Sequence, residues 1–497
     1  MQTTKYSLPK KAFIISFGKV INRLSALFAI MYLSYALSKD LYGSYRQVWL
    51  LFNMLVPMLS LGIPVSINYF LPLLNDNQRK TFTIQTYFLL CFLGVIFSLF
   101  LFFGSDQLAK LFNNPDIGIL LKYFSIIPFL CLPTLFYQNL FVCLDNPVLA
   151  TKVSLFSSIT YVLAIIIPIH FGYTLANMIG FLTIHYLIQF LVFSVLMYRM
   201  FINIQFDYSF RLLKEQIYYA IPVGMTSVIG LVSINVDKIF ISSFFNPEIF
   251  AEYANGSMEL PFIGILTGSI MAVLMPEFVK LYKNKDIKNL IKIWHSSIMK
   301  VAFLFFPLMC ILFIYSEEFM TLFFSSKYKS SAQIFKIYLL GLPCRITIFG
   351  VILLSLNLSS YVFKYAIYTF ILNLILNYVL INQLGVIGPA VSTIMVTYFI
   401  AALQLNRISK EFNYKFYSIF PWKKLIQLMT ISILVLLSVY VIDLLVIEKI
   451  IVSNAMMQNL IIIVAGSTVY FLIFISMCFL TKFLSKEDVF IFLRKLI

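Results

Sequence analysis

The sequence predicts an all-α integral membrane protein with about fourteen transmembrane helices. Of its 497 residues, 61% are hydrophobic and only 11% are charged, whereas a soluble domain carries about 25% charged residues. Several apolar runs, such as 83–104 and 459–480, are long enough for a helix to cross a bilayer, which takes about 20 residues. Barrel strands would instead alternate apolar and polar residues over about 10 positions. Helices are therefore the elements that satisfy the backbone in lipid here.

Polar and turn-forming residues separate the expected helices. Clear breaks occur at Asn113-Asn114-Pro115 and Asp145-Asn146-Pro147, because Asn and Pro favour turns and helix starts. We expect helices at about 11–37, 46–74, 83–104, 117–144, 148–171, 174–200, 214–244, 254–282, 290–316, 330–357, 361–382, 386–407, 424–447 and 456–481. The first is too long for a removable signal peptide and carries charges inside, so we expect it to remain as the first span.

The distribution of Lys and Arg predicts the orientation. With the N-terminus inside, 24 of the 37 basic residues fall in inside segments and 8 in outside segments or outer helix ends. Cytoplasmic loops are enriched in Lys and Arg, and an even number of spans places both ends on one side. We therefore expect both termini in the cytoplasm.

Two stretches of similar pattern predict an internal repeat. Residues 38–45 follow the first expected helix and residues 246–253 follow the seventh, and both combine an acid, an aliphatic, an aromatic and a small residue before Tyr. A lysine also precedes a proline by six or seven residues in helices 117–144 and 330–357. We interpret helices 1–6 and 7–12 as two parallel copies of one unit.

This interpretation divides the chain into three parts. They are an N-lobe at 1–207, a C-lobe at 208–412, and two additional helices within 413–497. Parallel six-helix repeats are a known plan of transporters, with the substrate path between the halves.

Two groups of residues resemble a known family. The first comprises Gly18-Lys19, residues 37–47 and residues 61–64; the second comprises Leu356-Asn357, Asn373, Asn377-Tyr378 and residues 385–390. In order and spacing they resemble polysaccharide biosynthesis membrane proteins. These are the repeat-unit (Wzx-type) oligosaccharide flippases of the multidrug/oligosaccharidyl-lipid/polysaccharide exporter superfamily. The resemblance extends over essentially the whole chain.

The resemblance implies a flippase of the bacterial inner membrane that needs no cofactor. It would move undecaprenyl-pyrophosphate-linked sugar units to the outer leaflet by alternating access, for O-antigen, capsule or similar surface polysaccharide. Membrane lipids and other polysaccharide-assembly membrane proteins are the expected partners.

Charged residues inside the expected helices are the candidate site residues. Such charges cost about 2.5–3.5 kcal/mol at the bilayer centre, so they suggest function. The cations are Lys19, Arg23, Lys238, Lys300 and Arg345, and the acids are Asp237 and Glu259. The balance is basic, which favours an anionic ligand such as a pyrophosphate headgroup.

The alternatives for these residues stay open at this stage. Lys19 and Arg23 are four residues apart and share one helix face, but Lys19 could extend to the cytoplasmic surface instead. Arg345 suits bidentate phosphate contact, or it could form an ion pair with Asp237 or Glu259. Those two acids are also candidates for binding a coupling ion.

Other functions fit the sequence less well. The basic residues lie in short loops and form no folded basic domain, which argues against nucleic acid. The six cysteines include no CxxC pair and the three histidines are scattered, so we expect neither a disulfide nor a metal site. The longest outside loops lack the paired acid and base groups of an enzyme. The rival functions are a peptidoglycan-precursor flippase and a multidrug or cation exporter of the same superfamily.

Overall fold

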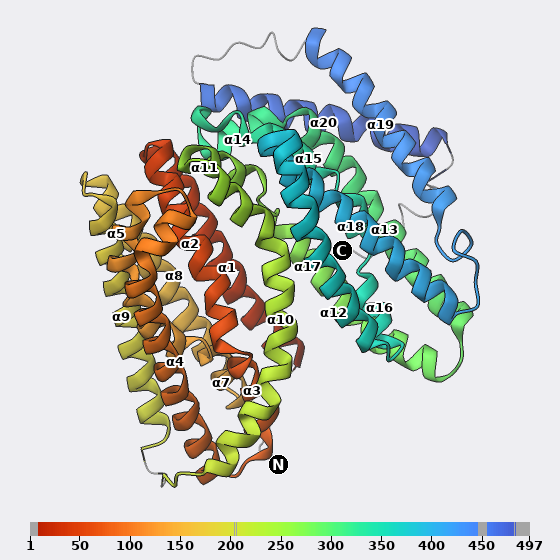
Figure 1. Cartoon of the computed structure of the whole chain (residues 1–497). Coiled ribbons are helices and arrows are strands. Elements are labelled where there is room, and N and C mark those ends of the chain that lie inside the picture. Colours follow the sequence, from red (N-terminus) through yellow and green to blue (C-terminus); the bar gives the residue numbers. More distant parts are fainter. Residues whose placement is uncertain (1–7, 203, 205, 446–454, 482, 484–497) are drawn as a thin grey trace. The chain divides into compact units, whose positions relative to one another are not determined.

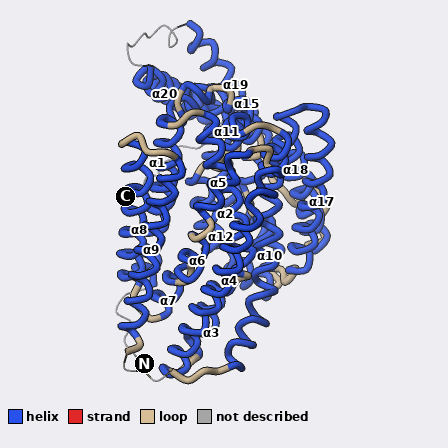
Figure 2. The backbone as a smooth tube through the Cα atoms, turned by 60° about the vertical axis from the view of Figure 1, so that its left-hand side comes forward, coloured by secondary structure: helices blue, strands red, loops and turns tan. Residues whose placement is uncertain are grey.

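Helices form every regular element in the part of the chain that the structure describes. The computed structural model describes residues 8–202, 204, 206–445, 455–481 and 483. Within these ranges no strand occurs, as Figure 2 shows. The predicted all-α class is therefore confirmed. The predicted positions of residues 1–7 and 484–497 on the cytoplasmic side concern residues outside the described ranges.

The number of candidate spans agrees with the sequence. Among the described residues, eleven helical stretches are long and apolar enough to cross a membrane, or thirteen if each of two bent pairs forms one span. The longest stretch, Ser359–Glu411, contains two helices, α17 (Ser359–Leu384) and α18 (Gly388–Glu411). They separate at Gly385, whose φ of 61° suits glycine, and pack against each other. Counting α17 and α18 separately gives the expected fourteen.

The described residues form two compact units, Met1–Ala251 and Glu252–Ile497. The predicted boundary between residues 207 and 208 rests on an internal repeat, whereas the division at Ala251 rests on packing. The division into an N-lobe at 1–207, a C-lobe at 208–412 and two additional helices at 413–497 stays a prediction. Packing places the seventh expected helix, α10 (Phe210–Phe244), against α2, α3 and α4 of the first unit.

The first unit contains the helices that run from red to yellow-green in Figure 1. They are α1 (Leu8–Ala36), α2 (Lys39–Ser60), α3 (Ile63–Phe70), α4 (Asp76–Leu111), α5 (Pro115–Phe124), α6 (Ile127–Cys131), α7 (Tyr137–Cys143), α8 (Pro147–His170), α9 (Leu175–Met200) and α10.

Two helices expected to be continuous are broken in this unit. The helix predicted at 46–74 begins earlier, at Lys39, because Ser38 accepts a hydrogen bond from the Leu41 amide and caps it. It then bends by 42° between α2 and α3. The helix predicted at 117–144 consists of α5, α6 and α7, interrupted near prolines that cannot donate the helical hydrogen bond.

The bend between α2 and α3 packs against a glycine of α10. Leu61 and Gly62 adopt φ values of 44° and 75° at the bend. A Cβ atom at Gly224 would lie 2.2 Å from the carbonyl carbon of Leu61. Only glycine at position 224 allows the two backbones to approach this closely.

Three helix starts use the same local device. Asn114, Asn146 and Asp286 each accept a hydrogen bond from a backbone amide in the first turn. The residue before each has a positive φ, of 45°, 58° and 58° respectively. The polar breaks seen in the sequence are therefore short turns that reverse the chain.

The second unit contains the remaining helices, with the end of α11. They are α11 (Pro247–Gly256), α12 (Pro261–Lys283), α13 (Ile287–Ile314), α14 (Ser316–Phe324), α15 (Ser331–Leu339), the 3-10 turn η4 (Leu342–Ile346), α16 (Phe349–Ser355), α17, α18, α19 (Trp422–Leu445) and α20 (Ala455–Leu480). The sequence did not predict the short helices α11 and α14.

The last two helices attach to the second unit through α13 and α14. α19 packs on α13, and α20 packs on both α14 and α19. Tyr315 donates a hydrogen bond to Asp443 at 3.3 Å, and Asn459 donates one to Thr321 at 2.8 Å. The ring of Tyr315 lies on Gly466, where a Cβ would be 1.9 Å from its hydroxyl oxygen. Polar contacts thus supplement the apolar packing of these helices.

Candidate functional site

α1 presents one face to α8 and leaves its two cations on another. Asn22 accepts a hydrogen bond from Ser158, and the Thr151 hydroxyl bonds to the Ile14 carbonyl at 2.9 Å. Gly18 lies four residues before Asn22 and also faces α8. Lys19 and Arg23, which follow these two residues by one position, are exposed. Within the described residues neither cation has an ion-pair partner.

Lys238 and Asp237 lie beside each other within α10. The Asp237 side chain is 1% exposed and that of Lys238 is 16% exposed, with Nζ and Oδ1 3.9 Å apart. A buried ion pair of this kind can be costly to break. Lys238 is thus the least accessible of the five candidate cations, and its role in substrate binding stays a prediction.

Arg345 and Glu259 form an ion pair in the second unit. Arg345 lies in η4, where α15 and the segment Leu342–Ser355 meet at a 43° bend. Its Nη1 atom is 3.5 Å from Oε1 of Glu259, and the two side chains are 55% and 58% exposed. The predicted alternative of an ion pair with Glu259 is therefore present, in a form that leaves both groups accessible.

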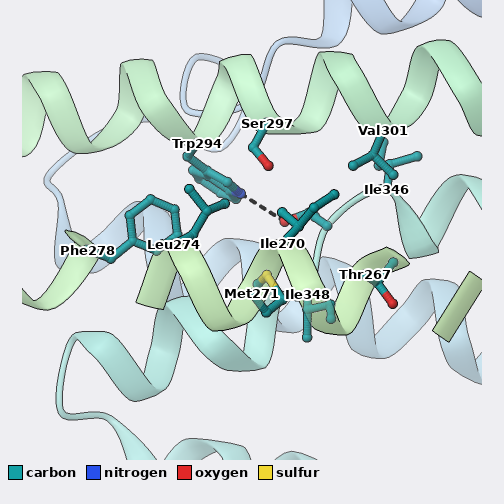
Figure 3. A pocket seen from close by; sticks show the side chains of 11 residues that line it. Thr267, Ile270, Met271, Leu274, Phe278, Trp294, Ser297, Val301, Ile346 and Ile348 are labelled. Carbon is teal, nitrogen blue, oxygen red and sulfur yellow. Dashed lines mark hydrogen bonds between the residues drawn. The ribbon is translucent and has the colours of Figure 1, made fainter. Parts of the chain in front are cut away.

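Lys300 is exposed on α13. No ion pair joins it to another described residue. Ser297 and Val301 of the same helix line a cavity closed by α12 and by the segment after Arg345, and Figure 3 shows them. Trp294 donates a hydrogen bond to Thr347 across this cavity at 2.9 Å, the dashed line in Figure 3.

The cavity beside Trp294 is too small for a sugar. Its volume is about 10 Å³ and most of its lining is apolar, which corresponds to roughly one water molecule. The candidate cations do not line it. The cavity is a packing feature of the second unit rather than a substrate pocket.

Neutral amides, which intramembrane charge does not reveal, hold α10 to other helices of the first unit. Gln47 donates to Ser242 at 2.8 Å and accepts from Asn114 at 2.6 Å, all buried. Near the other end of α10, Gln216 donates to Ser66 and Thr86 at 3.0 and 2.9 Å. In the sequence, a single amide residue within an apolar run is the pattern that could have indicated these contacts.

A second neutral group lies between α17 and α18. Asn373, Asn377 and Ser392 are 3%, 0% and 0% exposed. The Asn377 amide and the Ser392 hydroxyl have no hydrogen-bond partner among the described residues. The two asparagines belong to the sequence pattern used for the family resemblance, although no role was assigned to them.

Among the described residues no group of three or more His, Cys, Asp or Glu side chains could hold a metal ion. All six cysteines are free thiols, three of them buried. The exposed cations Lys19, Arg23, Lys300 and Arg345 can bind an anion.

Comparison with known proteins places the chain in a family. A family model described as "Polysaccharide biosynthesis protein" matches residues 35–333, which is more than half of the chain. The chain belongs to this family. A search among curated proteins gave no match.

Solved structures share the fold over most of the chain. A structure of the lipid II flippase MurJ in an inward closed conformation has a TM-score of 0.73 at 18% identity, covering 95% of this chain and 100% of that one. An inward-facing multidrug resistance MATE family transporter of the MOP superfamily has a TM-score of 0.63 at 13% identity, covering 78% and 95%. The Vibrio cholerae MATE transporter VcmN in its bent form has a TM-score of 0.54 at 13% identity, covering 84% and 100%.

These identities are low, so the structural likeness establishes the fold. The family match confirms the predicted membership of the polysaccharide biosynthesis family, and the solved structures show that its fold occurs in flippases and MATE transporters. The protein is a multi-pass membrane protein with a transporter fold.

Proposed function

We propose that this protein is a flippase that moves a lipid-linked oligosaccharide from the cytoplasmic to the outer leaflet of the bacterial inner membrane. The family match over residues 35–333 carries the proposal. The substrate would be a sugar unit on undecaprenyl pyrophosphate, destined for O-antigen, capsule or a similar surface polymer. Both termini would lie in the cytoplasm, as the distribution of Lys and Arg favours.

The accessible cations support an anionic substrate. Lys19, Arg23 and Lys300 are exposed and have no acidic partner among the described residues. Arg345 is exposed with one acidic partner. A pyrophosphate headgroup offers oxygens that a guanidinium can bind in a bidentate manner. Arg23 and Arg345 are the residues that we assign to this contact.

The membrane potential can drive such a transfer. An inside-negative potential favours outward movement of an anion by roughly 2.3 kcal/mol per charge per 100 mV. A headgroup with two negative charges would gain about twice this amount. A catalytic step is not required for this function, and the protein acts as a transporter rather than an enzyme.

Complementation in a strain that lacks its own oligosaccharide flippase tests the proposal. The unmutated chain should restore surface glycan, and Arg23→Ala and Arg345→Ala should reduce it at matched membrane expression. Full restoration by both variants would refute the assignment of these residues. Increased drug tolerance without any glycan would refute the function.

The fold likeness to MurJ makes lipid II flipping the second candidate. Both substrates present a pyrophosphate to the same cations, so the residues alone do not separate them. The two candidate substrates are distinguished by depleting the essential lipid II flippase in a strain that expresses this protein and measuring survival. Survival would favour lipid II, whereas death with restored surface glycan in the first strain favours the lipid-linked oligosaccharide.

A further inference from the structure

The ion pair between Arg345 and Glu259 is held by a single contact between exposed side chains. It consists of one contact of 3.5 Å between Nη1 and Oε1, and more than half of each side chain is exposed. No other hydrogen bond or ion pair holds either side chain among the described residues. Exposed pairs of this kind contribute little to stability.

Another pair in the same unit provides a contrast. Arg407 and Glu411 are 2.8 Å apart and only 23% and 22% exposed. Glu411 also accepts a hydrogen bond from Tyr282 at 2.9 Å, and the Arg407 guanidinium lies 4.5 Å from the centre of the Tyr361 ring. That arrangement fixes three helices to one another, whereas the pair at Arg345 fixes nothing further.

We propose that Glu259 is an exchangeable counter-ion, which occupies Arg345 until the anionic phosphate headgroup of the substrate displaces it. This inference rests on the proposed function. A guanidinium within a membrane-spanning segment is costly unless it faces water or has a partner. A single carboxylate contact supplies that partner, and a phosphate with two parallel hydrogen bonds replaces it because the bidentate contact is stronger.

The backbone around Glu259 can stabilise the released carboxylate. Glu259 precedes Leu260, the N-cap of α12, and Pro261, its first residue. The amino end of a helix carries partial positive charge, which favours a nearby carboxylate. Glu259 therefore has a favourable position both before and after the exchange.

The exchange also gives selectivity by charge. A cationic or neutral ligand cannot replace the carboxylate at Arg345, so the pair stays closed to it. An anion gains the contact only after Glu259 is released, and the free energy of that release lowers its apparent affinity. Removing the carboxylate should thus tighten the binding of anions.

Binding of farnesyl pyrophosphate to the purified full-length protein in detergent tests this inference, with farnesol as the uncharged probe. Glu259→Gln should tighten binding of the pyrophosphate by about fivefold or more and leave farnesol unchanged. Arg345→Gln and Arg345→Lys should weaken it, the lysine variant less. Glu215→Gln is the matched control, since Glu215 pairs with Arg211 on the exposed start of α10, and should have no effect.

A double variant with the two charges exchanged, Arg345→Glu with Glu259→Arg, separates exchange from a purely structural pair. A structural pair would regain wild-type binding and thermal stability in the double variant. The exchange requires the guanidinium at position 345, so the double variant should fold but bind weakly.

The outcomes also separate this inference from the proposed function. Unchanged or weaker pyrophosphate binding by Glu259→Gln, or restored binding by the double variant, would refute the exchange while the function stands. If the unmutated protein failed to bind the pyrophosphate more tightly than farnesol, the anionic substrate itself would be wrong, and the exchange with it.

Discussion

Replacing Gly224 by alanine would force α10 away from the bend between α2 and α3. The added Cβ would lie 2.2 Å from the Leu61 carbonyl carbon and 2.4 Å from its oxygen, whereas ordinary contact begins at 3.4 Å. The two backbones would have to separate by about 1 Å, because a backbone carbonyl cannot turn aside as a side chain can. Overpacking of this kind costs about 1–3 kcal/mol.

The same helix offers a matched control. Gly230 lies six residues further along α10, and a Cβ there would meet nothing within 4 Å. Alanine is the better helix former by roughly 0.5–1 kcal/mol, so Gly230→Ala should stabilise while Gly224→Ala destabilises. Thermal unfolding of both purified variants in the same detergent measures the difference. Equal midpoints, or a higher midpoint for Gly224→Ala, would refute the close approach at this bend.

Three further predictions concern polar and charged groups. Arg23→Ala should reduce the restoration of surface glycan and leave the unfolding midpoint unchanged, since Arg23 is exposed. The neighbouring control Leu24→Ala should change neither the glycan nor the midpoint. A loss of both activity and stability in Arg23→Ala would contradict the assigned role. Gln216→Ala should lower stability by about 1–3 kcal/mol, whereas exposed Lys214→Ala should leave the unfolding midpoint unchanged. Burial raises the pKa of the Glu318 carboxyl, as does nearby Glu317. A carboxyl with a raised pKa destabilises the folded protein once the pH is high enough to ionise it. Glu318→Gln should therefore stabilise the protein at pH 8, and the gain should shrink as the pH falls toward 4.5. An equal gain in stability at all pH values would contradict the raised pKa.

Local sequence patterns anticipated the helices well, and their ends less well. Each of the fourteen expected helices has a counterpart among the described residues, because long apolar runs and Asn-Pro turns are local signals. The early start at Lys39 depended on a single Ser38 cap. The breaks near the prolines of helices 117–144 and 330–357 depended on how neighbouring helices satisfy the freed backbone groups.

The candidate site was anticipated as a set of charges but not as an arrangement. The exposure of Arg23 follows from the opposite face of α1 packing on α8 through Gly18 and Asn22. The sequence left open whether Arg345 pairs with Asp237 or with Glu259, and the structure shows it 3.5 Å from Glu259. The buried amides Gln47 and Gln216 are uncharged, so intramembrane charge did not indicate their role.

The amino-acid pattern alone predicts a multi-span helical membrane protein that resembles a polysaccharide biosynthesis family and has a basic set of intramembrane charges. Hydrophobicity, helix length and local turns decide these properties, and each acts over one or two dozen residues. The packing of the helices shows which charges are paired, buried or accessible, and that α10 belongs to the first unit. Those properties depend on which helix faces meet, and a few neutral residues such as Gly224 and Gln47 settle that at contacts between distant parts of the chain.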